Sequence, residues 1–404
     1  MSDLPLRELE DAVATSLSWY NEGKVLFLAP VRKTVVSSSD AVFYNPRMEF
    51  QRDVSICVTL TYSKMMEREM DLCEPLASCG VRAIRWACEV PGIRHIVAGD
   101  VNQKAVLLAN INACLNNVLG KVEFFRADAR FLLDTNSSFG QRFDVVDIDP
   151  FGSPVNFIDP AIKALKKEGG LLCLTATDMQ PLCGIHQDAC LRKYGGRSLR
   201  TEYCHEIAVR LVIGAAAWIA ARHNTRTSVL FSHSSDHYVR AYLSIKKNAI
   251  DADKSIMEIG CILHCFNCGN RKTTRSIVIS TTDLNCELCG SKMRIAGPLW
   301  CGDLWGKEFV HAAKTVAEKL EYTFGQRRMM KMLDTILSES NGPITYYDLH
   351  YLSEAEGTSS PSTSRMVQLL RENGFFASPT HFRGTGVRTS ADIKTIRSLM
   401  KQLE

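Results

Sequence analysis

The sequence predicts an α/β fold built on a mostly parallel sheet, and three observations support this prediction. Short apolar runs alternate with stretches of helical periodicity from about residue 71 to 246. Acidic residues directly follow several of the apolar runs, where strands of such a sheet end. The last two runs, within residues 228–246, have only serine, aspartate and histidine between them. Because helices join parallel strands while short polar turns join antiparallel ones, we expect a parallel sheet that closes with a hairpin.

Five predicted strands and the helices between them make up the parallel part of the sheet. The strands are expected at residues 70–77, 94–101, 121–129, 143–150 and 169–178. One helix occupies residues 80–90, and the next occupies residues 102–117 with Asn102 as its N-cap. The helix before the fifth strand is expected to end in "LKKEGG" (165–170), because glycine commonly stops a helix. With the closing hairpin, this architecture is typical of class I methyltransferases.

The composition indicates an intracellular protein with two domains. The chain has 404 residues and a formal net charge of +4, which is too small to identify a nucleic-acid partner. Fifteen cysteines without an export signal favour reduced thiols. The longest apolar run, residues 211–221, is too short to cross a bilayer. We therefore expect a buried helix there, a cytoplasmic protein, and neither a membrane nor an obligate protein partner. A polar break at residues 248–255 predicts a domain at 1–250 and another at 251–404.

The loop after the first predicted strand favours a nucleoside ligand without phosphates. It follows Glu74 and contains only Gly80, so the G-x-G-x-x-G pattern of dinucleotide sites is missing. Such a loop can still approach S-adenosylmethionine. Asp100, at the end of the second strand, can accept hydrogen bonds from ribose hydroxyls, and Asp128, after the third, can hold the adenine amino group. Either aspartate can instead be a helix cap, but acids at three successive strand ends favour the binding site.

The stretch "DIDPFGSP" (147–154) follows the fourth predicted strand, beside the reactive end of such a cofactor. An exocyclic amine on a base is a poor nucleophile, because its lone pair is delocalised into the ring. Asp149 can accept the amino proton, and the turn fixed by Pro150 can aim a backbone carbonyl at the second amino hydrogen. The ring of Phe151 can stack on the base. The alternative is a structural turn in which the acid caps a helix and the phenylalanine is buried.

The chain also resembles the tRNA guanine-26 N2-dimethyltransferase family from about residue 20 to its end. The shared motifs are "VFYNPRMEFQRD" (42–53), "LASCGVRAIRW" (76–86), "DIDPFGSP" (147–154), "TATDMQPLCG" (175–184), "ACLRKYGGRSLRTEYCHE" (189–206) and "THFRGTGVRTSA" (380–391). The resemblance implies transfer of two methyl groups from S-adenosylmethionine to the N2 amine of guanine 26 in tRNA. It makes residues 1–250 the catalytic domain and residues 251–404 a tRNA-binding domain.

The resemblance further implies which side chains meet the cofactor and the base. Its cofactor contacts fall on Arg52, Arg82, Asp100, Asp128 and Ala129. Phe43 would join Phe151 around the target base. From the sequence alone, structural or surface salt bridges are the favoured interpretation of the two arginines, and the resemblance reverses this preference.

Two matched cysteine pairs, "CFNC" and "CELC", predict a zinc ribbon at about residues 261–295. The four cysteines are Cys265, Cys268, Cys286 and Cys289, with seventeen residues between the pairs. This is the spacing of a site with four thiolate ligands, and such a site leaves no open position, so the metal is expected to be structural. Disulfides are the competing interpretation, which a reducing compartment disfavours.

The sequence after the ribbon, from about residue 296 on, predicts three short helices followed by a strand-like tail, similar to a winged helix. Arg327, Arg328 and Lys331 can meet RNA phosphates there, or they can be the solvated face of a helix.

Two other functions remain open at this point. One is an amino methyltransferase for another RNA guanine, or for adenine or cytosine in DNA, although Gly152 and the C-terminal region argue against DNA. The other is a binding protein that keeps the fold as an RNA scaffold without catalysis. The presence of Asp100, Asp149, Pro150 and Phe151 argues against the scaffold.

Overall fold

The computed structural model describes residues 6–31, 42–321 and 323–403. By compactness the chain divides into two units, Met1–Cys173 with His311–Lys331 and Leu174–Val310 with Met332–Glu404. Each unit is therefore assembled from two separate segments of the chain. The predicted division near residue 250, into a catalytic and a tRNA-binding domain, is one of function that compactness does not test, and it stays a prediction.

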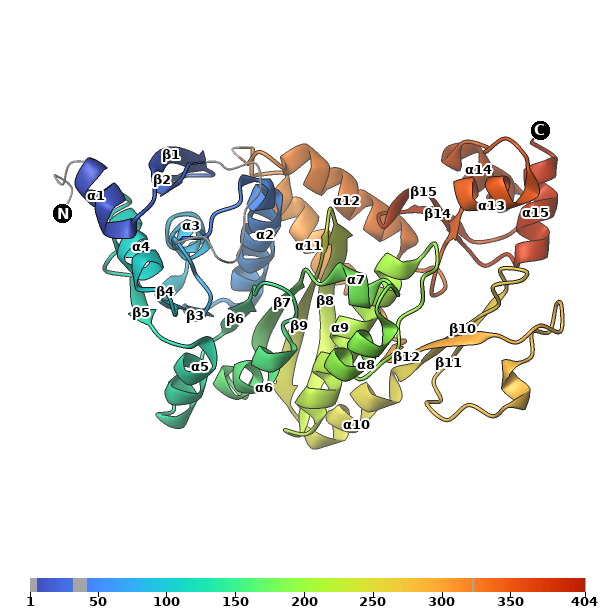
Figure 1. Ribbon diagram of the computed structural model, residues 1–404, viewed down its shortest axis with the longest axis horizontal. Helices are drawn as coiled ribbons and strands as arrows, with labels where there is room; N and C mark the ends of the chain where they lie inside the picture. Colours follow the sequence, from blue (N-terminus) through green and yellow to red (C-terminus); the bar gives the residue numbers. More distant parts are fainter. Residues whose placement is uncertain (1–5, 32–41, 322, 404) are drawn as a thin grey trace. The chain divides into compact units, whose positions relative to one another are not determined.

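A seven-stranded sheet has the strand order β5-β4-β3-β6-β7-β9-β8 (Figure 1). Its strands are β3 (Met70–Glu74), β4 (Ile93–Asp100), β5 (Val122–Arg126), β6 (Val145–Ile148), β7 (Gly170–Ala176), β8 (Thr225–Ser235) and β9 (Tyr238–Lys247). β3 pairs in parallel with β4 and β6, β4 pairs in parallel with β5, and β8 and β9 form an antiparallel hairpin. The predicted sheet is confirmed. Because β4 and β6 flank β3 on opposite sides, strand succession reverses between β3 and β6.

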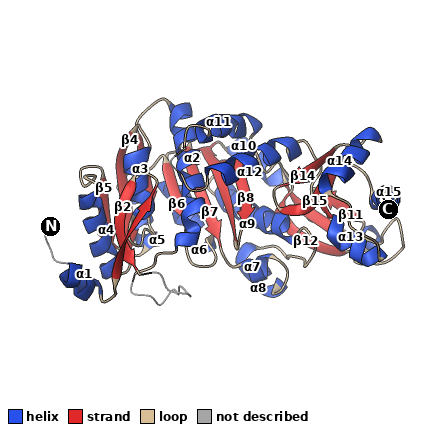
Figure 2. Cartoon of the chain, turned by 90° about the horizontal axis from the view of Figure 1, so that it is seen from above, coloured by secondary structure: helices blue, strands red, loops and turns tan. Residues whose placement is uncertain are grey.

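Helices alternate with these strands, as the blue and red elements of Figure 2 show. Before β7 the helices are α1 (Leu6–Val13), η1 (Pro46–Met48), α2 (Glu49–Met66), α3 (Val81–Glu89), α4 (Gln103–Leu115), α5 (Ala129–Ser138) and α6 (Val155–Ala164). Asn102 caps α4, as predicted. The prediction that the last of these helices ends at glycine is wrong. α6 ends at Ala164, because Leu165 is extended and forms an isolated parallel bridge with Phe143.

A short antiparallel hairpin near the start of the described chain was not predicted from the sequence. It consists of β1 (Leu17–Glu22) and β2 (Val25–Pro30). Both faces of β2 are apolar, and Val25, Phe27 and Leu28 are buried. Its outer residues, among them Leu26, lack the regular polar alternation by which a strand is usually identified.

The second unit contains four helices before the ribbon. They are α7 (Met179–Leu182), α8 (Gln187–Tyr194), α9 (Cys204–Ala221) and α10 (Ala249–Met257). Among the described residues, α9 alone has the length and hydropathy of a membrane span, yet 72% of it is buried in the protein. The predicted buried helix at residues 211–221 is therefore confirmed as part of α9.

The ribbon and the C-terminal region each contain a small antiparallel sheet. In the ribbon, β10 (Ile259–His264) lies between β11 (Arg271–Thr274) and β12 (Arg294–Trp300), and the 3-10 turn η2 (Thr282–Leu284) precedes β12. The remaining elements are α11 (Lys307–Ala317), α12 (Gln326–Glu339), β13 (Tyr347–Asp348), α13 (Leu349–Glu356), α14 (Thr363–Glu372), β14 (Ala377–Thr380), β15 (Arg383–Thr389) and α15 (Ile393–Lys401). Their sheet has the order β13-β15-β14, which with α12 to α14 matches the predicted winged-helix-like arrangement. The final helix, α15, adds Ile393, Ile396 and Leu399 to the core.

Candidate active site and zinc centre

The point where strand succession reverses is where open α/β sheets bind their ligands, at the carboxyl ends of the strands. β3 ends at Glu74, and Asp149 directly follows the end of β6. Arg82, in the first turn of α3, contacts both carboxylates. The fold thus brings the predicted residues Arg82 and Asp149 together at one site.

Arg82 is buried among three carboxylates and one amide. Its Nη1 lies 2.9 Å from Asp147 Oδ1 and 3.5 Å from Glu74 Oε1. Its Nη2 contacts Asp149 Oδ2 and donates a hydrogen bond of 2.6 Å to Gln51 Oε1. Gln51 Nε2 in turn donates to Asp149 Oδ2 at 3.0 Å. The Asp149 carboxylate is therefore held in one orientation by two side chains from different helices.

Glu74 is buried in a cluster that has more carboxylates than guanidinium groups, and this raises its pKa. Burial raises the pKa of Glu74 to about 8, and the charges of Asp147 and Asp149 act in the same direction against the opposing effect of Arg82. Because one cation cannot neutralise three neighbouring carboxylates and Glu74 is fully buried, Glu74 is the group that keeps its proton at neutral pH.

An exposed aromatic ring stands next to the catalytic aspartate predicted from the sequence. Pro150 is buried, whereas 56% of the Phe151 surface is exposed. The Phe43 ring meets Phe151 edge to face, with ring centroids 4.5 Å apart and planes at 85°. The interpretation of Phe151 as a core residue is excluded by this exposure, and the two rings predicted to flank the base lie together.

Backbone and side-chain hydrogen bonds connect this aromatic pair to the loop between β3 and α3, residues 75–80. Ser78 Oγ donates to the Phe43 carbonyl at 2.5 Å, and the Ser78 amide donates to Asp100 Oδ2 at 3.0 Å. Asp100 Oδ1 accepts from the Asn102 amide at 2.8 Å. Burial raises the pKa of Asp100, while these two amide hydrogen bonds oppose the rise. Each Asp100 oxygen therefore has one protein donor.

Asp128 occupies a more exposed position at the start of α5. Its Oδ1 accepts from the amides of Arg130 and Phe131 at 2.9 and 3.3 Å, so Asp128 does cap a helix, which was the alternative to the predicted cofactor contact. Hydrogen bonds from the Arg130 side chain lower the pKa of Asp128 further. Ala129, the first residue of α5, is buried. Whether Asp128 and Ala129 also contact adenine stays a prediction.

Arg52 is buried in an ion pair rather than pointing freely into the site. Its Nε donates to Glu22 Oε2 at 2.7 Å, and its Nη2 donates to the Asn45 carbonyl at 3.2 Å. Tyr44 donates its hydroxyl to Glu22 Oε1 at 2.8 Å. Arg52 thereby fixes the segment that carries Phe43. The ion-pair interpretation is confirmed for Arg52 and Arg82, and their contacts with a cofactor stay predictions.

Gln51, Ser78 and Glu22 were not predicted as members of this site. Gln51 directly precedes Arg52, and its partner Asp149 lies 98 positions further along the chain. Local spacing gives no sign of such a pair. The signal that was available is their position, since Gln51 and Ser78 lie within motifs of the family resemblance.

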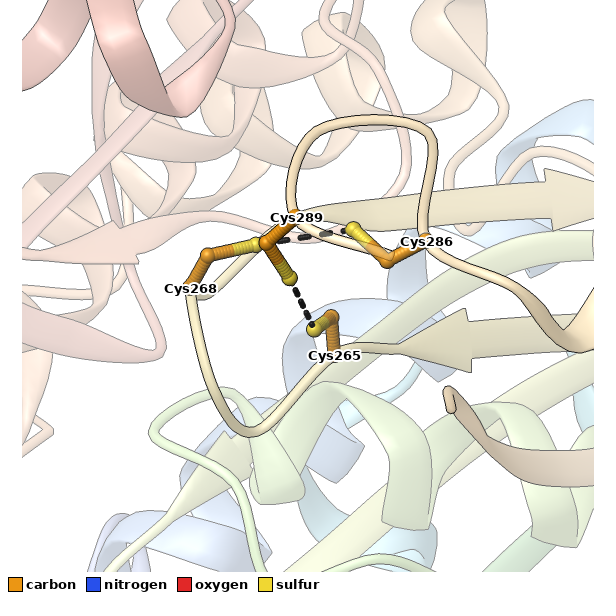
Figure 3. Close-up of side chains that lie close together, drawn as sticks. All are labelled: Cys265, Cys268, Cys286 and Cys289. Carbon is orange, nitrogen blue, oxygen red and sulfur yellow. Dashed lines mark hydrogen bonds between the residues drawn. The ribbon is translucent and has the colours of Figure 1, made fainter. Parts of the chain in front are cut away.

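The four ribbon cysteines converge on one point (Figure 3). Cys265 Sγ lies 3.5 Å from Cys289 Sγ, and Cys268 Sγ lies 3.5 Å from Cys286 Sγ. Tetrahedral coordination with Zn–S bonds of about 2.3 Å would place the sulfurs about 3.8 Å apart. The donor set and its spacing therefore fit a zinc ion.

The backbone next to each cysteine pair forms the same tight turn. The Gly269 amide donates to the Cys265 carbonyl at 2.8 Å, and the Gly290 amide donates to the Cys286 carbonyl at 2.8 Å. Both glycines have positive φ angles, +77° and +72°, which side chains disfavour. Hydrogen bonds from Ser291 and Asn267 lower the pKa of Cys289 to about 5, which favours the thiolate that zinc requires.

Comparisons with known proteins extend over nearly the whole chain. The family described as "N2,N2-dimethylguanosine tRNA methyltransferase" matches residues 23–401. A tRNA (guanine(26)-N(2))-dimethyltransferase of Methanothermobacter thermautotrophicus is 39% identical over 384 residues, which cover 95% of this chain and 98% of that protein. A tRNA (guanine(26)-N(2)/guanine(27)-N(2))-dimethyltransferase of Aquifex aeolicus is 34% identical over 389 residues and covers 95% of each chain.

A solved structure of a protein with a similar fold also matches nearly the whole chain. Trm1 from Pyrococcus horikoshii in complex with S-adenosyl-L-methionine has a TM-score of 0.83 and 29% sequence identity, and the match covers 95% of this chain and 100% of that one. Together with the sheet order and the residues gathered where strand succession reverses, these matches identify the chain. It belongs to the N2,N2-dimethylguanosine tRNA methyltransferase family.

Proposed function

We propose that this chain transfers two methyl groups from S-adenosylmethionine to the exocyclic N2 amine of guanine 26 in tRNA. The observation that carries the proposal is the arrangement of Asp149 beside the exposed Phe151 and its neighbour Phe43, where strand succession in the sheet reverses. Family membership and the names of the relatives support this substrate.

We assign the cofactor to the carboxyl ends of β3, β4 and β5. S-Adenosylmethionine, when bound, supplies an electrophilic methyl group on its sulfonium. Each Asp100 oxygen has one protein donor and can accept a further hydrogen bond from a ribose hydroxyl. We assign adenine to Asp128 and Ala129. Arg52 and Arg82 would then contact the cofactor from the ion pairs that already fix them.

Asp149 is the proton acceptor of the proposed reaction. When the N2 lone pair forms a bond with the methyl carbon, the bond from this carbon to the sulfonium sulfur would break, a neutral thioether would leave, and the amine becomes cationic and must lose one proton. An Asp149 oxygen that accepts the amino hydrogen can take this proton, while the Pro150 carbonyl accepts the second amino hydrogen. After the first transfer one amino hydrogen remains, and the same carboxylate can serve the second transfer once it has released the first proton to water. Because both transfers would depend on this one carboxylate, its orientation matters, and Gln51 and Arg82 hold it in place.

The aromatic pair positions the base. A planar guanine can stack against Phe151, with Phe43 at its edge, and such stacking contributes about 1–3 kcal/mol per base. Since guanine 26 must leave its neighbours to reach this site, stacking offsets part of the cost of unstacking it.

The remaining parts of the proposal concern tRNA and location. We assign tRNA binding to residues 251–404 and include Arg327, Arg328 and Lys331 in the contact surface. The Arg328 guanidinium lies over the Phe50 ring, 4.1 Å from its centroid, so it already has a role within the protein. The proposal places the enzyme in the cytoplasm, without a membrane or an obligate protein partner.

Mass spectrometry of nuclease fragments from a tRNA transcript incubated with enzyme and cofactor identifies the modified base and its position. We expect dimethylguanosine at position 26 and no product at that position when guanine 26 is replaced by adenine. Methylation of a different base, or cofactor binding without any transfer, would contradict the proposal. The name of the Aquifex relative gives both guanine 26 and guanine 27 as its substrates. A transcript with guanine at both positions therefore also reports whether this enzyme modifies one or both.

A further inference from the structure

A second cluster of potential metal ligands lies in the second unit, apart from the zinc ribbon. It consists of Cys183, which follows α7, and of Cys204 and His205, the first two residues of α9. One ligand atom from each residue lies within 4.8 Å of the others. Neither the methyl transfer nor the ribbon uses these side chains.

The chain is built so that the segment after α7 and the segment before α9 meet. Gly184 has a φ angle of +90°, and a Cβ atom there would lie 2.2 Å from the Arg200 backbone nitrogen. Only glycine permits this approach. Ser198 Oγ donates to the Pro181 carbonyl at 2.6 Å and connects α7 itself to the segment before α9. The position of Cys183 against the start of α9 therefore follows from backbone packing.

The chemistry of the three groups suits a soft divalent cation. Cys204 lies in the first turn of α9, where helix amides favour a negative charge. The Cys183 and Cys204 thiols lie within hydrogen-bond reach of each other. His205 offers an imidazole nitrogen within 4.8 Å of both sulfur atoms. Within residues 6–31, 42–321 and 323–403, the His205 ring has no hydrogen-bond partner.

We propose that Cys183, Cys204 and His205 bind a second zinc ion, with the fourth coordination position open to water or another ligand. Two thiolates and one imidazole form a known zinc donor set, and three protein ligands with an open position differ from the closed four-thiolate ribbon. Such an ion would cross-link α7 to the start of α9. A disulfide between Cys183 and Cys204 is the rival use of the same pair and would leave His205 without a role.

Zinc content of the full chain, purified under reducing conditions, tests this site without reference to activity. We expect about two zinc ions per chain, and about one in the Cys265→Ser/Cys286→Ser variant, which keeps only the second site. His205→Ala should also retain about one, held by the ribbon, and the three substitutions together should leave none. Cys88→Ser, a half-buried cysteine outside both clusters, is the matched control and should keep two, as does the wild type.

Replacement of zinc by cobalt gives a second readout that does not depend on the stability of a variant. Cobalt bound to the ribbon-deficient variant should show sulfur-to-metal charge-transfer absorption, and this absorption should disappear with His205→Ala. One zinc per wild-type chain, lost entirely with the ribbon substitutions, would overturn the proposal. So would an intact mass two hydrogens lighter together with a Cys183–Cys204 cross-linked peptide, because this result would identify a disulfide.

Discussion

At the scale of single residues, the candidate site depends on acids that differ in their surroundings. Asp149 is partly exposed and bonded to Arg82 and Gln51, Asp100 is capped by two amides, and Glu74 is buried with an excess of negative charge around it. The same functional group is thus available as a proton acceptor, as a hydrogen-bond acceptor for ribose and as a neutral acid. Environment rather than residue type separates the three roles.

Asp100→Ala is expected to weaken S-adenosylmethionine binding by about 1.5–3 kcal/mol, because the ribose hydroxyls lose a charged acceptor. Isothermal titration calorimetry measures the change. Asp134→Ala removes an exposed acid of α5 that has no place in the site and should leave the affinity unchanged. Equal affinities of wild type and Asp100→Ala would remove Asp100 from the cofactor site.

Glu74 predicts a pH dependence of stability. Its pKa is about 8 in the folded protein and 4.5 ordinarily, so that between these values the folded state binds more protons than the unfolded state. The free energy of unfolding should therefore fall as pH rises from about 4.5 to 8, by at most about 1.4 kcal/mol per pH unit from this group. Denaturant unfolding at a series of pH values measures the slope.

Glu74→Gln is the matched variant for this slope. Glutamine is neutral at every pH, and its oxygen can accept the hydrogen bond that the Ala83 amide donates to Glu74 at 3.0 Å. The decline of stability with pH should be less steep in the variant. An unchanged slope would show that Glu74 is ionised in the folded protein at neutral pH.

At the scale of elements, the ribbon is the part whose stability most depends on a bound group. Its three short strands bury a small cluster that includes Leu263, Cys265, Cys286 and Met293. A core of this size contributes little by itself, and a zinc ion bound to the four cysteines would supply the missing free energy.

Cys265→Ser/Cys286→Ser should therefore release the ribbon zinc and destabilise this region before the rest of the chain. Hydrogen exchange should increase first in the amides of residues 259–300. The Cys88→Ser variant should exchange as the wild type does. Full protection of these amides after complete removal of zinc by a chelator would contradict a structural role for the metal.

Elements with a local signal were predicted well, and those that depend on distant partners were not. Apolar runs and short connections identified β3 to β9, and the spacing of the cysteine pairs identified the ribbon. The predicted end of α6 was wrong because Leu165 forms a bridge with Phe143, and the sequence around Leu165 gives no sign of this distant partner. The contacts of Gln51 and Ser78, and the proximity of Cys183 to Cys204, escape prediction for the same reason.

At the scale of the whole molecule, the chain returns to its first unit after leaving it. Residues 311–331 belong with residues 1–173, and the Gly325 amide donates to Asp53 Oδ2 at 3.0 Å. α2 carries both this contact and Gln51, which holds Asp149. The helix that positions Asp149, the proposed proton acceptor, is thus also supported by a segment from late in the sequence.

We propose above that Asp149 accepts the proton during methyl transfer to guanine N2. Single-turnover kinetics of Asp149→Ala at saturating tRNA and cofactor measures this role without a contribution from substrate binding. We predict a rate lower by about 10²–10⁴-fold with cofactor affinity nearly unchanged, whereas Phe151→Ala should show a smaller defect, partly in apparent tRNA affinity. An Asp149→Ala enzyme that is folded, binds both substrates and methylates at nearly the wild-type rate would contradict the account.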